Sequence, residues 1–179
     1  MVDIIPLSDD TTEGAEAAIE RIFFASAGRK TFADEAEQSA FRERWLGRYL
    51  LHDRSHAFVA RDASDGVVGY LVGSLDDPAR TDRFRDISFY AGFADLTVRY
   101  PAHLHINLDP EWRSQGIGGR LINAFASHAA KRGAGGVHIV TGDGVRNVRF
   151  YERCGFVGLR ACAWGDAQVL IMGRMLGAR

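Results

Sequence analysis

A glycine-rich stretch between a short apolar run and an amphipathic run constrains this chain more than any other feature. Residues 104–108 alternate apolar and polar side chains, as a β-strand does. Asp109-Pro110 ends the alternation, because proline cannot donate a ladder hydrogen bond. Polar and glycine residues fill 113–119, and apolar residues then recur at helical spacing. The stretch therefore predicts a strand, a glycine-rich loop and a helix in immediate succession.

Such a loop is suited to hold phosphate groups. Glycines let successive N–H groups turn toward one point, and they let an anion approach without meeting a Cβ. The first turn of the following helix adds unpaired N–H groups and a partial positive charge. The pattern predicts a pyrophosphate site flanked by two arginines. Its candidate residues are Arg113, Gln115, Gly116, Ile117, Gly118, Gly119 and Arg120.

Three other interpretations of the loop compete with this one. The dinucleotide-binding fingerprint requires a third glycine where Leu121 stands, and its loop follows the strand directly, whereas residues 109–115 intervene here. A Walker loop ends in Gly-Lys-Ser/Thr, which this loop lacks. A glycine-rich connection without a ligand stays open. Three glycines within four residues, between two arginines, make it the weaker interpretation.

Two segments together resemble the GNAT superfamily of N-acetyltransferases. The run Arg-Ser-Gln-Gly-Ile-Gly at 113–118 matches its Arg/Gln-x-x-Gly-x-Gly/Ala signature. Residues 147–156 resemble its Asn-x-x-x-x-Phe-Tyr-Glu-x-x-Gly-Phe segment, with a shorter gap after the asparagine. The resemblance implies an α+β fold with a mixed central β-sheet of about seven strands, flanked by helices, whose central parallel strands splay apart. Residues 100–106 resemble a narrower subgroup, the bacterial acetyltransferases related to the acetyltransferase-like C-terminal domain of O-GlcNAcase.

The resemblance also implies a cofactor and the residues that bind it. In the family the glycine-rich loop holds the pyrophosphate of acetyl-coenzyme A. The backbone of Ile106 and Leu108 then pairs with the pantetheine arm, as an added strand would. Asn147 is expected to touch the pantetheine or the nucleotide, with a helix cap or first-turn role as the alternative.

Acetyl transfer to an amine also needs a proton donor for the thiolate and a base for the amine. The resemblance implies Tyr151 as the general acid, and a tyrosine packed in the core is the alternative. His105 is the candidate base because a histidine can titrate near neutral pH. It shares one strand face with His103 and Asn107, which are candidate acceptor-binding residues. Many family members carry a glutamate on this strand and this chain has none, so a structural role for His105 is at least as well supported.

The rest of the chain is compatible with that fold. We expect strands at 2–7, 57–61, 67–73, 136–141, 156–163 and 168–176, and helices at 15–25, from Asp34 to about 51, and at 145–154. Residues 76–100 are irregular and rich in aromatic and arginine side chains. They form either a wall over the active site or, as we favour for most of the aromatics, a packed excursion that closes the core. Tyr100 stays a candidate for acceptor binding.

Composition bounds the class of protein. The 179 residues suit a single acetyltransferase domain over 1–179, and a net charge of −1 offers no general field for nucleic acid or membrane lipid. No signal-peptide pattern and no membrane-spanning apolar run is present, so a cytoplasmic location is expected. The six histidines show no ligand spacing that indicates a metal. Homodimers are common in the family, so a homodimer is one expected state.

Two hypotheses follow. The first is an acetyl-coenzyme A-dependent N-acetyltransferase that transfers the acetyl group directly to a small-molecule or protein amine acceptor. The second is a degenerate module, a pseudo-acetyltransferase, that binds acetyl-coenzyme A without transferring the acetyl group. The intact phosphate loop predicts cofactor binding in both.

Overall fold

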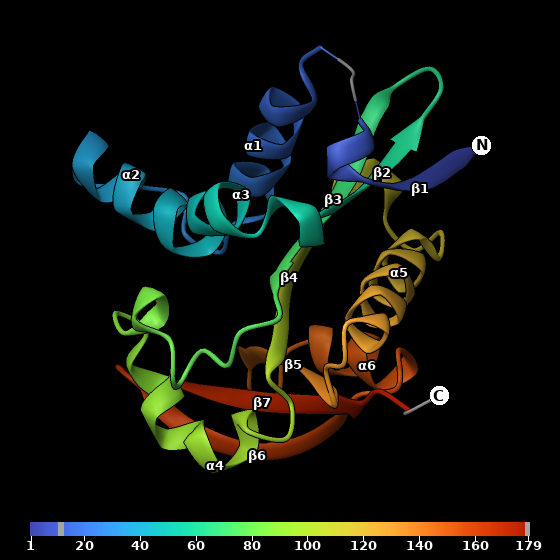
Figure 1. Ribbon diagram of the computed structural model, residues 1–179. Coiled ribbons are helices and arrows are strands. Elements are labelled where there is room, and N and C mark those ends of the chain that lie inside the picture. Colours follow the sequence, from blue (N-terminus) through green and yellow to red (C-terminus); the bar gives the residue numbers. More distant parts are fainter. Residues whose placement is uncertain (11–12, 178–179) are drawn as a thin grey trace. The chain divides into compact units, whose positions relative to one another are not determined.

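The computed structural model describes residues 1–10 and 13–177 (Figure 1). The strands are β1 (Val2–Pro6), β2 (Phe58–Asp62), β3 (Gly66–Ser74), β4 (Ala102–Leu108), β5 (Gly136–Gly142), β6 (Val157–Trp164) and β7 (Ala167–Met175). The α-helices are α1 (Ala15–Ser26), α2 (Glu35–Arg42), α3 (Arg48–His52), α4 (Ala94–Thr97), α5 (Ile117–Lys131) and α6 (Asn147–Arg153). Thr11 and Thr12, part of a polar turn predicted before α1, lie outside the described residues.

Short helical turns complete the element order. They are η1 (Leu7–Asp9), the π-helical turn η2 (Glu43–Gly47), η3 (Arg54–His56), η4 (Asp82–Phe84), η5 (Ser88–Phe93) and η6 (Pro110–Trp112). The helix predicted from Asp34 to about residue 51 is therefore interrupted by η2 between α2 and α3. Among the described residues, no helix has the length and apolar character needed to span a bilayer.

The strands form one mixed sheet, as predicted. Its order is β1-β2-β3-β4-β5-β7-β6. β1 and β2, β2 and β3, β5 and β7, and β6 and β7 pair antiparallel. β4 and β5 run parallel, with Ala102 opposite Val137 and His103 opposite His138. The splaying of the central strands stays a prediction.

The chain divides into two compact units. The first comprises residues 1–73 and 105–125, and the second comprises 74–104 and 126–179. β4 and α5 each contribute residues to both units. The single acetyltransferase domain over 1–179 stays a prediction, and each unit is described by itself below.

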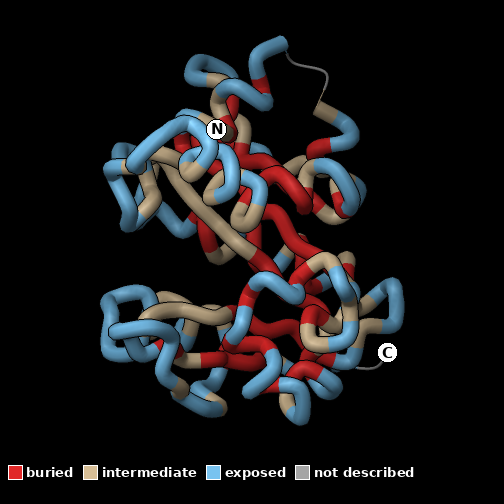
Figure 2. The backbone as a smooth tube through the Cα atoms, turned by 90° about the vertical axis from the view of Figure 1, so that its left-hand side faces the viewer, coloured by how far each residue is buried: buried red, intermediate tan, exposed pale blue. Residues whose placement is uncertain are grey.

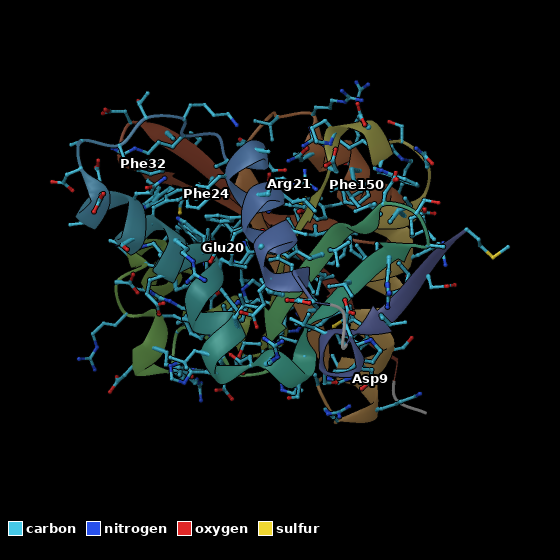
Figure 3. The ribbon with its side chains drawn as sticks, turned by 90° about the horizontal axis from the view of Figure 1, so that it is seen from above. Asp9, Glu20, Arg21, Phe24, Phe32 and Phe150 are labelled. Carbon is cyan, nitrogen blue, oxygen red and sulfur yellow. The ribbon has the colours of Figure 1, made fainter. Side chains whose placement is uncertain are left out.

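In the first unit, α1 buries one face and contacts both α2 and the segment that precedes α2. Ile19, Ile22 and Phe23 of α1 are buried, at the helical spacing predicted from the sequence. Glu20 accepts a 2.6 Å hydrogen bond from Arg42 of α2, and the rings of Phe24 and Phe32 meet edge to face at 6.4 Å. Figure 3 labels Glu20 and Phe24 on α1, together with Arg21, which the cofactor site uses.

The hairpin of β2 and β3 approaches the end of β4 closely in the same unit. Gly66 closes the turn between β2 and β3 with a φ of +70°, a conformation that favours glycine. A Cβ at Gly69 of β3 would lie 2.2 Å from Leu108 Cδ2 and 3.2 Å from the carbonyl oxygen of Asn107. Asp109 N–H donates to the Val68 carbonyl at 2.9 Å, so β3 holds the end of β4 beside the glycine-rich loop.

In the second unit, the aromatic excursion packs into the core, as favoured from the sequence. The buried rings are Phe84, Phe89, Tyr90, Phe93 and Tyr100. Tyr100 covers the two glycines that face it, because a Cβ at Gly136 or Gly173 would lie 2.6 or 2.8 Å from its ring atoms. Figure 2 colours the backbone by burial; β5 begins with buried residues, whereas most of β6 is exposed.

Candidate cofactor site

The glycine-rich loop ends at the start of α5 with two residues in the left-handed region. Ser114 has a φ of +64° and Gly116 a φ of +78°. Arg120 N–H donates to the Gly116 carbonyl at 3.2 Å, which is the first bond of the α5 ladder. The N–H groups of Ile117, Gly118 and Gly119 precede that bond and therefore lack partners within the helix.

This loop fits a diphosphate. A Cβ built at Gly116 would meet no atom within 4 Å, so the space beside the turn is open to a ligand. The free N–H groups and the positive end of the α5 dipole favour an anion there. Arg120 is exposed, and it has no ion pair within residues 1–10 and 13–177. The residues present can thus hold a pyrophosphate with backbone donors and one free guanidinium.

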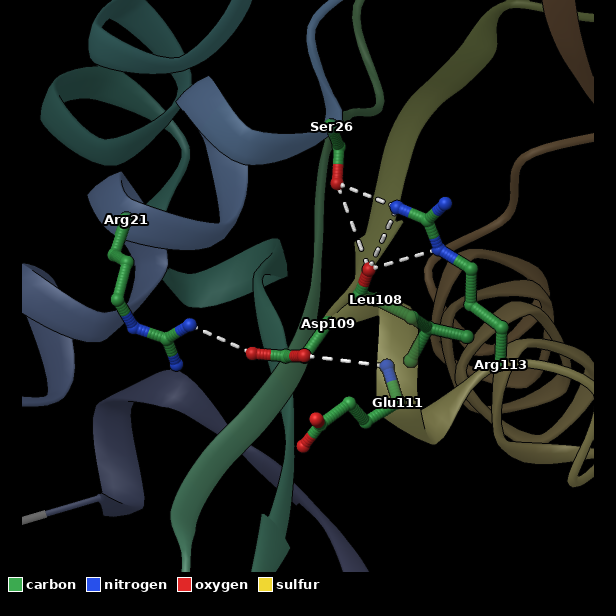
Figure 4. A network of polar contacts seen from close by, with 6 residues as sticks. All are labelled: Arg21, Ser26, Leu108, Asp109, Glu111 and Arg113. Carbon is green, nitrogen blue, oxygen red and sulfur yellow. Dashed lines mark hydrogen bonds and ion pairs between the residues drawn. The ribbon is translucent and has the colours of Figure 1, made fainter.

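Arg113 turns back onto the end of β4 (Figure 4). Its Nε and one terminal nitrogen each donate to the Leu108 carbonyl at 3.2 Å, and the same terminal nitrogen donates to Ser26 Oγ at 3.1 Å. Ser26 Oγ also donates to the Leu108 carbonyl, at 3.5 Å. The sequence predicts Arg113 as a residue that binds the phosphates. In the structure its guanidinium donates hydrogen bonds to Leu108 and Ser26.

Asp109 links the end of β4 to α1. It forms a 2.6 Å ion pair with Arg21, and its other oxygen accepts from Glu111 N–H at 3.3 Å (Figure 4). The hydrogen bond from Arg21 holds the pKa of the Asp109 carboxyl below its usual value, and the Glu111 N–H acts in the same direction. Asp109 therefore remains ionised near neutral pH.

Two polar side chains on one face of β4 are bonded to buried tyrosines. His105 Nε2 shares a 3.2 Å hydrogen bond with the hydroxyl of Tyr49, and Asn107 Nδ2 donates to the hydroxyl of Tyr70 at 2.8 Å. The rings of Tyr49 and Trp45 lie edge-on to His105, with centroids 5.2 and 5.4 Å away. Trp45 and Tyr49, whose i, i+4 spacing favours packing of the two rings, thus pack against the candidate base.

Tyr100 and His103, predicted to bind the acceptor, lie in the core of the second unit instead. Tyr100 is 5% exposed and covers two glycines, as described above. His103 is 1% exposed, stacks on His138 with centroids 5.4 Å apart, and meets Phe84 edge to face at 4.7 Å. Because packing accounts for both rings, the structure gives neither an acceptor-binding role. The strand alternation alone could not distinguish these positions from His105 and Asn107.

The second motif forms α6 and the turn that follows it. Asn147 is the first residue of α6, and Arg146 occupies the N-cap position, so of the two alternatives considered for Asn147 the first-turn position is confirmed and the cap is wrong. Tyr151 is half-buried, and its ring meets that of the buried Phe156 at 5.7 Å. Burial raises the pKa of the Tyr151 phenol, and the nearby Cys154 raises it further. The phenol therefore keeps its proton throughout the neutral range.

Comparison with known proteins identifies the family. The sequence profile of the Acetyltransferase (GNAT) family matches residues 17–156, which span the glycine-rich loop and the whole of the second motif. The chain belongs to the GNAT acetyltransferase family. This confirms the superfamily resemblance, and with it acetyl-coenzyme A as the cofactor that the family uses. The narrower O-GlcNAcase-like subgroup stays a prediction.

Solved structures confirm the GNAT fold. The crystal structure of SsHAT is 24% identical, with a TM-score of 0.71 and coverage of 98% of each chain. The polyamine N-acetyltransferase of Drosophila melanogaster is 14% identical, with a TM-score of 0.67 and coverage of 98% of this chain and 100% of that one. A putative streptothricin acetyltransferase from Bacillus anthracis, solved with acetyl-coenzyme A, is 19% identical, with a TM-score of 0.52 over 68% of this chain and 62% of that one.

Sequence reasoning missed two residues of this site. Arg21 lies 88 positions before Asp109, and Ser26 lies 87 positions before Arg113, so no local motif connects either pair. Both residues are on α1. The sequence shows the apolar spacing of this helix but does not show which residues its polar side chains contact. For metals, no cluster of three or more His, Cys, Asp or Glu side chains occurs within the described part of the chain.

Proposed function

We propose that this protein transfers the acetyl group of acetyl-coenzyme A directly to the amino group of an acceptor. The glycine-rich loop carries the proposal, since it presents free N–H groups to an open space at the start of α5 in a chain of the acetyltransferase family. A second support is Tyr151, a protonated phenol at the motif position where the family has its proton donor.

The chain's own groups divide the work of binding. The N–H groups from Gln115 to Gly119, which precede the first bond of the α5 ladder, hold the pyrophosphate, and the exposed Arg120 guanidinium offsets its charge. The peptide groups of Ile106 and Leu108 align the pantetheine arm along β4. Asn147, exposed in the first turn of α6, is proposed to contact the same arm or the nucleotide. Bound acetyl-coenzyme A supplies the acetyl group activated as a thioester.

Two side chains move protons in the proposed chemistry. His105, held by Tyr49, takes a proton from the acceptor ammonium directly or through water. The neutral amine attacks the thioester carbonyl, which an N–H near Leu108 polarises. The new C–N bond forms, the C–S bond breaks, Tyr151 gives its phenolic proton to the departing thiolate, and the acylated nitrogen loses its remaining extra proton to solvent. Solvent then restores the proton of Tyr151 and removes that of His105.

The acceptor is proposed by class only, as a small-molecule or protein amine. The Drosophila neighbour is an enzyme that forms N-acetylagmatine, and this supports an amine acceptor without naming one for this chain. Asn107 stays the candidate acceptor-binding residue, because it is half-buried on the same face of β4 as His105. The expectations of a cytoplasmic homodimer and of no nucleic-acid or membrane partner stay predictions, and light scattering of the purified chain tests the dimer.

Thiol release with acetyl-coenzyme A and a panel of amines tests the function. Tyr151→Phe should lower kcat by about 100-fold or more, the range of general acid catalysis, because the thiolate loses its donor. Its Kd for acetyl-coenzyme A should stay within about two-fold of wild type, since a phenol oxygen is all that is removed. Unchanged kcat across the pH range would remove Tyr151 from the mechanism, and no thiol release with any amine would leave transfer without support.

One observation favours the alternative of a degenerate cofactor-binding module. The candidate base, His105, is already hydrogen-bonded to a buried tyrosine, and the strand glutamate common in the family is absent. Under this alternative the wild-type chain binds acetyl-coenzyme A by calorimetry but shows no thiol release above the uncatalysed rate. If the wild type catalyses thiol release and His105→Gln abolishes it, the degenerate-module alternative is excluded.

A further inference from the structure

We propose that Arg21 and Ser26 of α1 are positioning residues of the cofactor site, and that Arg113 acts with them rather than as a phosphate ligand. Together they fix the end of β4, from which the glycine-rich loop departs. The inference rests on the proposed function in one respect, namely that this loop binds acetyl-coenzyme A. All the groups involved belong to the first compact unit.

The first tie is at the Leu108 carbonyl, the last carbonyl of β4. It accepts from two nitrogens of Arg113, each at 3.2 Å, and from Ser26 Oγ at 3.5 Å. Ser26 Oγ in turn accepts from Arg113 at 3.1 Å, so the three groups form a closed triangle (Figure 4). A planar guanidinium offers its donors in a fixed fork, which a lysine cannot reproduce. Arg113 therefore orients the strand end, and Ser26 orients Arg113.

The second tie leads from α1 into the loop. Arg21 pairs with Asp109 at 2.6 Å, and Asp109 accepts from Glu111 N–H at 3.3 Å. The carbonyl of Glu111 accepts from Gln115 Nε2 at 3.1 Å. A continuous path of hydrogen bonds thus connects α1 to the residue that directly precedes Gly116. A displacement of α1 would therefore also displace the turn that presents the N–H groups.

The two flanking arginines therefore have different tasks. Arg113 is engaged by Leu108 and Ser26, whereas Arg120 is exposed and has no ion pair among the described residues. Charge neutralisation of the pyrophosphate falls to Arg120 and the N–H groups. The side chain of Arg113 instead binds the end of β4, from which the loop departs.

A double-mutant cycle on acetyl-coenzyme A affinity tests this assignment. Kd is measured by calorimetry for wild type, Ser26→Ala, Arg113→Met and the double variant. Because Ser26 acts through Arg113, each single change should weaken binding about three- to ten-fold, and the double variant should bind no more weakly than Arg113→Met. Effects that multiply in the double variant would overturn the inference.

Arg120→Met is the matched control. In the double variant of Arg120→Met and Ser26→Ala, the two fold-changes in Kd should multiply, since the two residues share no partner. It should also reduce the salt dependence of binding, because it removes an exposed charge next to the phosphates, whereas Arg113→Met should leave that dependence unchanged. Equal reductions for Arg113→Met and Arg120→Met would make Arg113 a direct phosphate ligand and contradict the assignment.

The rescue experiment separates positioning from general stability. Arg113→Lys keeps the charge but not the fork, so its Kd should match that of Arg113→Met rather than wild type. Asp109→Asn and Arg21→Met should each raise the KM for acetyl-coenzyme A while kcat at saturation stays unchanged. If wild type itself fails to bind acetyl-coenzyme A, the proposed function falls together with this inference. If wild type binds and Arg113→Lys restores affinity, the inference alone falls.

Discussion

His105 is the residue on which the proposed chemistry depends most. One nitrogen of its ring is bonded to Tyr49, and the edge-on rings of Tyr49 and Trp45 limit how the imidazole can rotate. Trp45 lies in the π-helical turn η2, a departure from α-helical geometry that is frequent at functional sites. The turn and the tyrosine together hold the imidazole in one orientation, as a base that must meet its substrate requires.

Tyr49→Phe tests that orientation. The substitution removes one buried hydroxyl and keeps the ring, so the fold should lose only about 1 kcal/mol of stability. With His105 as the base, kcat should fall several-fold and the KM for acetyl-coenzyme A should stay the same. Tyr70→Phe is the control, because it removes the buried hydroxyl that accepts from Asn107 and leaves the contacts of His105 unchanged. An equal loss of kcat in both variants would show that Tyr49 has no special connection with the base.

At the scale of elements, particular side chains pack directly against the backbone of three strand glycines. β5 and β7 offer Gly136 and Gly173 to the ring of Tyr100, and β3 offers Gly69 to Leu108. In each case a side chain fills the volume that a Cβ would need. These glycines are packing partners of particular side chains rather than flexible points.

Gly136→Ala should destabilise the protein by about 1–3 kcal/mol, the usual cost of overpacking a filled core. The new methyl group would lie 2.7 Å from the backbone oxygen of Arg99, which cannot move aside as a side chain can. Urea unfolding gives the free energy. Gly28→Ala is the control, because a Cβ there meets nothing within 4 Å. Equal stability of the two variants would contradict the packing role.

Most element boundaries and the loop were predictable from the sequence because their signals are local, but the interruption of the predicted 34–51 helix by η2 was not. The Asp34 carboxylate accepts from Glu37 N–H at 2.8 Å, so its cap followed from residue type and position alone. The helix α1 followed in the same way from its apolar spacing. The partners of Arg113 and Asp109 could not be predicted, since they depend on where α1 docks. The burial of His103 could not be predicted either, because alternation along β4 places it on the same face as His105.

At the scale of the whole molecule, a buried histidine couples folding to pH. His138 is fully buried, and its Nδ1–H donates to the Tyr100 carbonyl at 2.5 Å. Burial lowers its pKa from 6.5 to about 4, so it is neutral in the folded state near neutral pH. The unfolded chain takes up a proton below pH 6.5 that the folded chain does not bind until about pH 4. Folding stability contributed by this group is therefore complete above pH 6.5 and is lost as the pH falls toward 4.

Urea unfolding of wild type and His138→Gln at several pH values checks this. Between pH 6.5 and 5 the wild type should lose about 2 kcal/mol of unfolding free energy through His138, at about 1.4 kcal/mol per pH unit. His138→Gln should be less stable at neutral pH but should lack this part of the slope. Parallel slopes for wild type and His138→Gln would mean that His138 does not titrate on unfolding.

The family match spans residues 17–156 and the fold match 98% of the chain, whereas the proposed function depends on one loop. The amide ¹H–¹⁵N spectrum of the protein, titrated with acetyl-coenzyme A, tests that dependence most directly. We predict that the largest shifts fall on the N–H groups from Gln115 to Arg120, and that inorganic pyrophosphate alone shifts the same resonances. Saturable shifts that leave these six N–H groups unmoved would place the cofactor elsewhere and contradict the account.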